Sequence, residues 1–302
     1  MNNKFKRRTF LTAVTGTLLG TPVALRFFRS DSGKHGQKVH HFTQELNRLQ
    51  TLMRVPITPS NGPSSFSLDL NPPVGQEWKY IVFAPSFLPG NFSQTLGGEP
   101  DVFLMKEGVL SVNKTHAGQI VLTGRDTNFS ICSPTHTEER PQNEIVLLAE
   151  DGNLYPATPK NSTMTVPPDE QFSHLLPLIG APKKLTICQK WKSNIGRVKP
   201  FEDCPTEYEV VGFAEVDGRK TIHIRFEGHT PNVAHLPGGN SQKLDKDTNM
   251  TNTHQGSTYF DLETGLLVRQ ETSMTTVYHS REFASQNGLT VNAQFSIQFF
   301  HA

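Results

Sequence analysis

The stretch that decides the fold lies near the C-terminal end and runs Leu289-Thr290-Val291-Asn292-Ala293-Gln294-Phe295-Ser296-Ile297-Gln298-Phe299. Its odd-numbered side chains are apolar and its even-numbered ones are polar. Successive side chains of an extended chain point to opposite faces, so this period of two gathers the apolar groups on one face. The run therefore predicts an antiparallel strand with one face in a core and the other in water.

Two hairpins are predicted upstream of this run. Residues 208–216 and 219–227 flank Asp217-Gly218, a dipeptide that two-residue hairpin turns prefer. Residues 259–268 show the same pattern of two extended runs around a turn. Together with the C-terminal run, these hairpins predict a meander.

Composition supports a β-rich globular protein. The chain has 302 residues, of which 35% are hydrophobic and 19% are charged, so it can bury a core. Its 21 Pro and 23 Gly are scattered, which favours many turns over long helices. We expect a mainly β fold with one or more antiparallel curved sheets or an open half-barrel, and a short N-terminal helix.

An internal duplication is one interpretation of a repeated tetrapeptide. Gln76-Glu77-Trp78-Lys79 recurs 113 residues later as Gln189-Lys190-Trp191-Lys192, and the same offset carries Gly152 to Gly265. Duplication would give two similar β-domains, or one sheet built twice. The alternative is chance, because the matching segments are short.

These patterns divide the chain into five segments. They are a signal or anchor at 1–30, a short helix and Pro-rich linker at 31–65, a first β-domain at 66–158, a Pro-rich connection at 159–183 and a second β-domain at 184–302.

The helix is predicted from residues spaced by three and four. Val39, Phe42, Leu46, Leu49 and Met53 would all lie on one face of a helix. We interpret it as a helix that docks on the protein's own core. A helix that lies on a membrane surface or binds a partner is the alternative.

The N-terminal segment resembles a bacterial export signal. A basic start precedes a short, mildly apolar run, and the string Arg7-Arg8-Thr9-Phe10-Leu11 resembles the twin-arginine motif. The resemblance implies a periplasmic or envelope location, with membrane contact only through this segment. Pro22-Val23-Ala24 fits a cleavage site poorly, so an uncleaved anchor stays open. The alternative is the basic helix start of a cytosolic protein.

Charge and cysteine content exclude two classes. The net charge is +1, and no stretch beyond the first 30 residues concentrates Lys and Arg, so we expect no binding to nucleic acid. Cys132, Cys188 and Cys204 are too few for a disulfide scaffold. One bridge is compatible with export, and Cys188 with Cys204 is the preferred pair. Three free thiols are the alternative.

Standard catalytic and cofactor strings are absent, so no catalytic residue and no cofactor are predicted. His229, His235 and His254 could converge on a metal ion, since imidazole suits zinc or copper. A surface connection between strands is the alternative interpretation of this segment. Asp261 and Glu263 would share one strand face as paired acids, although residues before a turn glycine are more often turn formers.

A resemblance to a known group rests on the segments 208–224 and 256–268, which cover the hairpins of roughly the last third of the chain. In pattern they are similar to exported bacterial β-proteins of the lipoprotein-carrier (LolA/LolB-like) type. The resemblance implies a curved antiparallel sheet that holds a hydrophobic ligand. It carries over no binding residues, and this chain is longer than the single-domain carriers.

Three functions follow as hypotheses. The first is a non-enzymatic envelope protein whose curved sheet binds an apolar or amphipathic ligand, lipid-like in character, or an envelope protein partner. The second is a secreted metal-assisted hydrolase that uses the histidine-bearing segment. A purely structural or adhesive role cannot be separated from the first hypothesis by sequence.

Overall fold

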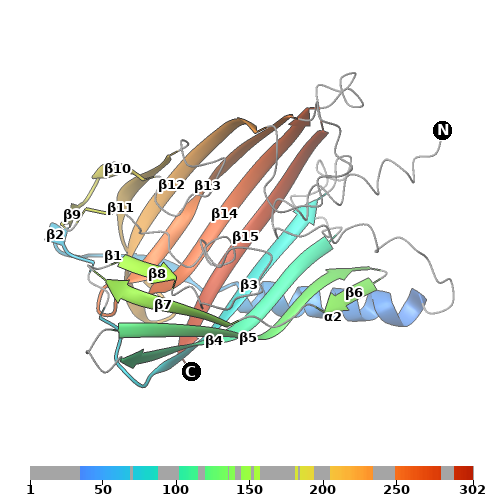
Figure 1. Cartoon of the computed structure of the whole chain (residues 1–302), viewed down its shortest axis with the longest axis horizontal. Helices are drawn as coiled ribbons and strands as arrows, with labels where there is room; N and C mark the ends of the chain where they lie inside the picture. Colours follow the sequence, from blue (N-terminus) through green and yellow to red (C-terminus); the bar gives the residue numbers. More distant parts are fainter. Residues whose placement is uncertain are drawn as a thin grey trace.

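The structure is a computed structural model (Figure 1). It describes residues 35–68, 71–87, 102–114, 120–134, 136–139, 144–150, 153–156, 181–182, 184–193, 205–233, 249–279 and 289–301. The predicted export motif at Arg7, Arg8, Phe10 and Leu11 lies outside these residues. Within them, no helix is both long and apolar enough to cross a membrane.

One helix, α2 (His35–Leu52), precedes a series of strands. The strands are β1 (Ile57–Ser60), β2 (Ser65–Phe66), β3 (Glu77–Phe87), β4 (Val102–Lys114), β5 (Ile120–Ser133), β6 (His136–Glu139), β7 (Glu144–Glu150), β8 (Asn153–Pro156), β9 (Leu185–Thr186), β10 (Lys190–Ser193), β11 (Thr206–Val216), β12 (Arg219–Val233), β13 (Asn249–Asp261), β14 (Leu267–His279) and β15 (Leu289–His301).

Nearly all of these strands form one antiparallel sheet. Its order is β1-β11-β12-β13-β14-β15-β3-β4-β5-β7-β8, with β10 added beside β11 and β6 beside β5. Among the described strands, the end strands β1 and β8 do not pair with each other, so the sheet stays open. The predicted mainly β fold with a short N-terminal helix is confirmed. The division into two β-domains stays a prediction, and strands from both predicted segments share this one sheet.

Local sequence signals placed the C-terminal meander correctly. The β11–β12 hairpin turns at Asp217 and Gly218, which both have positive φ (53° and 71°), as a two-residue hairpin turn requires. Gly265 has a φ of 69° in the turn between β13 and β14. The alternating run at the C-terminal end forms β15, which pairs with β14 on one side and β3 on the other.

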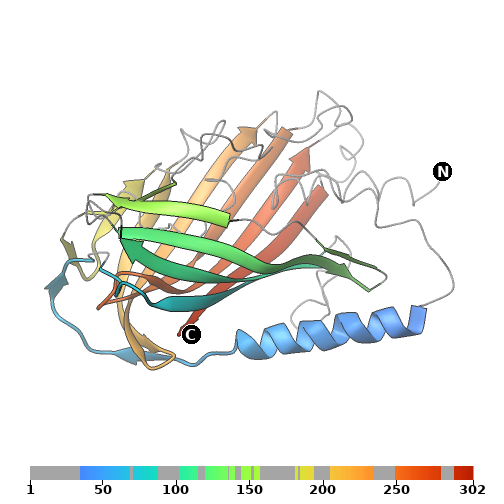
Figure 2. The ribbon, with the colours of Figure 1, turned by 60° about the horizontal axis from the view of Figure 1, so that its bottom comes forward.

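The sheet bends so that the β3–β5 part crosses in front of the β11–β15 part (Figure 2). We call the face between these parts the inner face. It carries one large apolar cluster to which both parts contribute, including Trp78, Tyr80, Val82, Ile222, Ile224 and Ile297. We call the opposite face the outer face.

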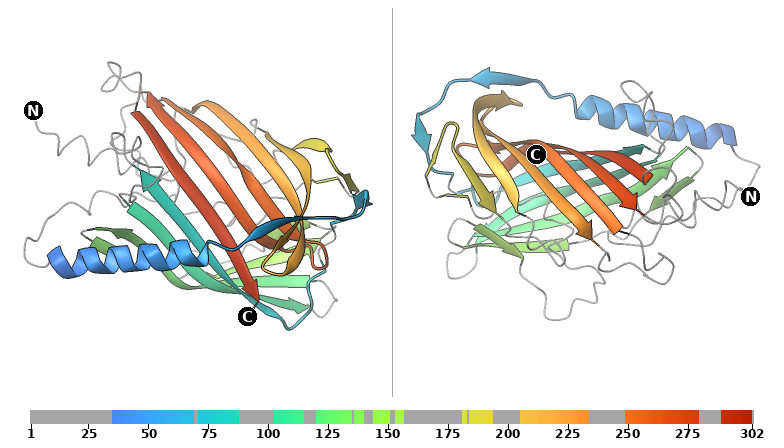
Figure 3. Two further views of the ribbon diagram at one scale, coloured as in Figure 1. Left: turned by 180° about the vertical axis from the view of Figure 1, so that it is seen from behind. Right: turned by 90° about the horizontal axis from the view of Figure 1, so that it is seen from above.

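Helix α2 covers the outer face of β3, β4 and β5 (Figure 3). Its apolar side buries Phe42, Leu46 and Leu49, and Met53, directly after the helix, is buried as well. These four side chains pack against Ile81, Phe83, Phe103, Met105 and Cys132 of the sheet. The interpretation of a helix docked on the protein's own core is therefore confirmed.

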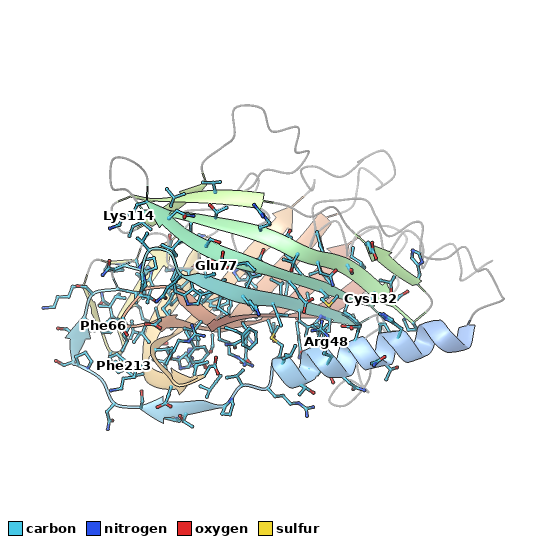
Figure 4. The ribbon with its side chains drawn as sticks, turned by 90° about the horizontal axis from the view of Figure 1, so that it is seen from below. Arg48, Phe66, Glu77, Lys114, Cys132 and Phe213 are labelled. Atoms are coloured by element: carbon cyan, nitrogen blue, oxygen red, sulfur yellow. The ribbon has the colours of Figure 1, made fainter. Side chains whose placement is uncertain are left out.

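Contacts at both ends of the segment that runs from α2 to β2 fix its position on the sheet. Arg48 of α2 forms an ion pair with Glu107 of β4 at 2.9 Å, near the end of the sheet that holds Cys132 (Figure 4). At the other end, Phe66 of β2 meets Phe213 of β11 edge-on, with ring centroids 5.4 Å apart (Figure 4). The chain after the helix is thus held against the far part of the same sheet.

Glycines make room for aromatic rings on the inner face. A Cβ atom added at Gly108 would overlap the ring of Tyr80 on β3 and lie 2.5 Å from the carbonyl oxygen of Arg125. A Cβ atom at Gly256 would lie 2.7 Å from Cζ of Phe226. Real Cβ atoms do not approach so closely, so either ring would have to move.

We expect Gly108→Ala to lower the free energy of unfolding by about 1–3 kcal/mol, because the added methyl group displaces Tyr80 and the Arg125 backbone. Gly212→Ala is the matched control, since a Cβ atom there meets nothing within 4 Å. Urea unfolding of both variants measures the difference. Equal stability of the two variants would contradict the close packing at Gly108.

Candidate functional site

A continuous row of cross-strand neighbours spans the inner face from β11 to β5, and we call it the central row. Its members are Val210, Ile224, Thr258, Gln270, Ile297, Val82, Lys106 and Phe129. Five of the eight are apolar, and the three polar members are buried. An apolar wall with a few fixed polar groups is typical of small-molecule sites.

Two of these polar groups have unsatisfied oxygens. Thr258 and Gln270 are direct partners on β13 and β14, with exposed fractions of 0% and 6%. Neither Oγ1 of Thr258 nor Oε1 of Gln270 has a hydrogen-bond partner. The amide nitrogen of Gln270 donates to the hydroxyl of Thr272 at 3.1 Å. Leaving a buried oxygen unpaired costs about 1–3 kcal/mol, so two side by side require an explanation.

The third polar member of the central row, Lys106, is paired. The ammonium group of Lys106 lies 3.2 Å from one carboxylate oxygen of Asp126, and the Tyr80 hydroxyl donates to the other at 2.6 Å. The Lys106 ammonium also lies 5.2 Å from the ring centroid of Phe129. These contacts hold a charged pair inside the protein, where an unpaired charge would be strongly unfavourable.

Burial sets the protonation of this polar cluster. Desolvation raises the pKa of the Tyr80 phenol, and the negative charge of Asp126 raises it further. The phenol therefore keeps its proton and acts as a donor. Burial lowers the pKa of Lys106, while the charge of Asp126 and its hydrogen bond oppose this effect.

A row of three neighbouring aromatic rings, on β10, β11 and β12, lies beside the central row. The rings of Trp191 and Tyr208 stack with centroids 5.2 Å apart, and Phe226 lies 6.3 Å from Tyr208. The indole Nε1 of Trp191 is buried and has no hydrogen-bond partner. The wall beside Thr258 is thus aromatic, with a third unsatisfied polar atom at its edge.

A hollow of about 730 Å³ lies on the outer face of the same strands. Charged and hydroxyl or amide side chains line it, among them Lys190, Glu209, Arg225, Glu271 and Ser257. Glu209 pairs with Arg225 at 2.6 Å, and this hydrogen bond lowers the pKa of the Glu209 carboxyl. Exposed pairs of this kind are typical of the solvated face of an antiparallel sheet.

Of the three histidines predicted to bind a metal ion, the structure describes His229 and His254. Their side chains point to opposite faces of the sheet. His229 is exposed on β12, with Nδ1 3.2 Å from the hydroxyl of Thr253. His254 pairs with Gly228, the neighbour of His229, so its side chain points to the opposite face. Its Nε2 lies 3.3 Å from the Thr206 hydroxyl.

His235 lies outside the described residues, so the three-histidine site stays a prediction. Within the described part of the chain, no group of three or more His, Cys, Asp or Glu side chains could hold a metal ion. Asp261 acts as a turn former, because its carboxylate accepts hydrogen bonds from the backbone N–H groups of Glu263 (2.7 Å) and Thr264 (3.1 Å).

The cysteines have different surroundings. Cys132 lies beneath α2, and burial raises the pKa of its thiol to about 11. Cys188 is exposed and carries a free thiol in this structure. Its predicted partner Cys204 lies outside the described residues, so the bridge stays a prediction.

No family model and no curated protein sequence matches this chain. Among solved structures, the chain is similar to the crystal structure of a DUF1329 family protein from Desulfovibrio piger, with 8% sequence identity and a TM-score of 0.16. The match covers 88% of this chain and 93% of the other. At that TM-score the similarity supports no conclusion about function.

Sequence reasoning missed Thr258, Gln270, Lys106 and Asp126. A signal existed for Lys106, because it follows the apolar triplet Phe103-Leu104-Met105 inside a strand that is buried on both faces. No comparable signal marked Thr258 or Gln270. Their significance depends on which strands lie side by side.

We expect Lys106→Met to lower the free energy of unfolding by about 3–5 kcal/mol, because it leaves the Asp126 carboxylate buried without its cation. Adding Asp126→Leu should recover a large part of that loss, since the double variant removes both charges. Denaturant unfolding of the single and double variants gives the coupling energy.

The control for this cycle is Arg48→Met, which breaks a part-exposed pair with Glu107 and should cost about 0–1 kcal/mol. Strictly additive effects of the Lys106 and Asp126 substitutions would contradict a buried, mutually dependent pair.

Proposed function

We propose that this protein is an exported, non-enzymatic envelope protein that binds an amphipathic ligand on the inner face of its curved sheet. The central row is the observation that carries this proposal. It presents five apolar side chains with isolated polar groups set among them, which suits a ligand with an apolar body and a small polar part.

The open sheet supports access to this face. Among the described strands, no pairing joins β1 to β8, so a ligand that separated the two parts of the sheet would break no strand pairing there. The outer face offers less to an apolar body. Beneath α2 it is already covered, and its hollow over β11 to β15 is lined mostly by charged and polar side chains.

The polar groups of the inner face favour binding over catalysis. Lys106 is held by Asp126 and Asp126 by Tyr80, so these groups stabilise each other. Thr258 and Gln270 are uncharged and supply hydrogen bonds. Export rests on the resemblance of the string at Arg7 and Arg8 to the twin-arginine motif.

The proposal is tested by native mass spectrometry of the full chain purified from a bacterial envelope fraction. We expect a bound mass in the range of a lipid, because the apolar wall retains an amphiphile through purification. Ala84→Phe should lose this mass, since Ala84 is buried in the inner-face cluster and the larger ring would occupy the ligand's place.

Val211→Phe is the matched control, because Val211 is 40% exposed and the new ring enlarges a side chain in contact with solvent. Circular dichroism establishes that both variants fold. A wild-type protein that carries no bound mass, or an Ala84→Phe protein that keeps it, would count against the proposal.

A further inference from the structure

The unsatisfied oxygens of Thr258 and Gln270 specify the chemistry of a ligand more closely. They belong to partner residues on β13 and β14, at the middle of the central row. Their neighbours along the row are Ile224 and Ile297, which offer no hydrogen bond. Within the row only Thr258 and Gln270 could satisfy each other, and in this structure they do not.

We infer that the ligand carries an uncharged head group with a hydroxyl, and that this hydroxyl binds between Thr258 and Gln270. The inference rests on the proposed function and names the class of ligand. An amide oxygen only accepts hydrogen bonds, so Oε1 of Gln270 requires a donor. The Thr258 hydroxyl can donate, so one ligand hydroxyl can donate to Gln270 and accept from Thr258.

Charge excludes a carboxylate head group at this position. A carboxylate cannot donate, so it would place a negative charge against the Gln270 oxygen in a buried setting. The nearest buried cation of the central row is Lys106, three strands away, and Asp126 already neutralises it. Arg269, the neighbour of Gln270 along β14, hydrogen-bonds Glu271 and Gln298. Its side chain points to the opposite face.

An ether lacks the required hydrogen as well. A methyl ether of the same chain length can accept from Thr258 but cannot donate to Oε1 of Gln270, so it loses one hydrogen bond, worth about 1.4 kcal/mol. That difference corresponds to about tenfold in the dissociation constant. Alcohol and ether therefore form a matched pair that differs in the donated hydrogen bond.

The experiment measures displacement of the neutral fluorescent dye N-phenyl-1-naphthylamine from the full chain by 1-dodecanol, dodecyl methyl ether and dodecanoate. We expect the alcohol to bind about tenfold more tightly than the ether and more tightly than the carboxylate. Gln270→Met should reduce the preference for the alcohol over the ether to about one. It removes the acceptor at similar size.

Gln255→Met is the control on the same sheet, because Gln255 lies on β13 in the outer-face hollow and should leave the preference unchanged. Thr258→Val is a second variant, to be used if Gln270→Met does not fold. It should also reduce the preference for the alcohol over the ether. Equal affinity of the wild-type protein for alcohol and ether would overturn the inference, and so would a preference that both Gln270→Met and Thr258→Val retain. In either case, binding of the dye would still support an amphiphile-binding protein. A folded wild-type protein that binds neither the dye nor the alcohol would overturn both.

Discussion

The pairing of β15 with β3 is the constraint on which the rest of the structure depends. It joins strands from the two halves of the sequence and turns two meanders into one sheet. β3 can occupy this position because both of its faces are covered. Ile81 and Phe83 lie beneath α2, while Tyr80 and Val82 face the other part of the sheet. The central row exists only because this seam places Val82 beside Ile297.

Much of the fold was predictable because its signals are local. The alternation in β15, the Asp217-Gly218 turn and the helical spacing in α2 each act within a few residues, and all three appear in the structure. The pairing of β15 with β3 was not predictable, since it joins residues more than 200 positions apart. Local patterns specify which face of a strand is apolar, but they do not specify its neighbours.

The same limit explains why the candidate site was missed. Thr258 and Gln270 are ordinary polar residues of β strands in the sequence, and they become unusual only when burial and pairing place two unsatisfied oxygens side by side. The histidine hypothesis used spacing along the chain instead. Spacing alone could not show that His229 and His254 lie on opposite faces of the β12–β13 pair.

The two polar parts of the central row differ in a way that bears on function. Lys106, Asp126 and Tyr80 satisfy one another, so they need no further group. Thr258 and Gln270 retain unmet hydrogen-bonding capacity within an apolar wall, at an energetic cost that a bound ligand would offset. The inner face thus combines a self-contained polar cluster with a polar pair whose hydrogen-bonding capacity the proposed ligand would satisfy.

The most direct test of this account is a crystal structure of the full chain with 12-bromododecanol, in which anomalous scattering locates the bromine atom. The account predicts the hydroxyl between Thr258 and Gln270, at hydrogen-bond distance from both oxygens, with the chain and bromine along the apolar inner face. An alcohol bound in the outer-face hollow, or on the inner face with its hydroxyl away from both residues, would contradict it.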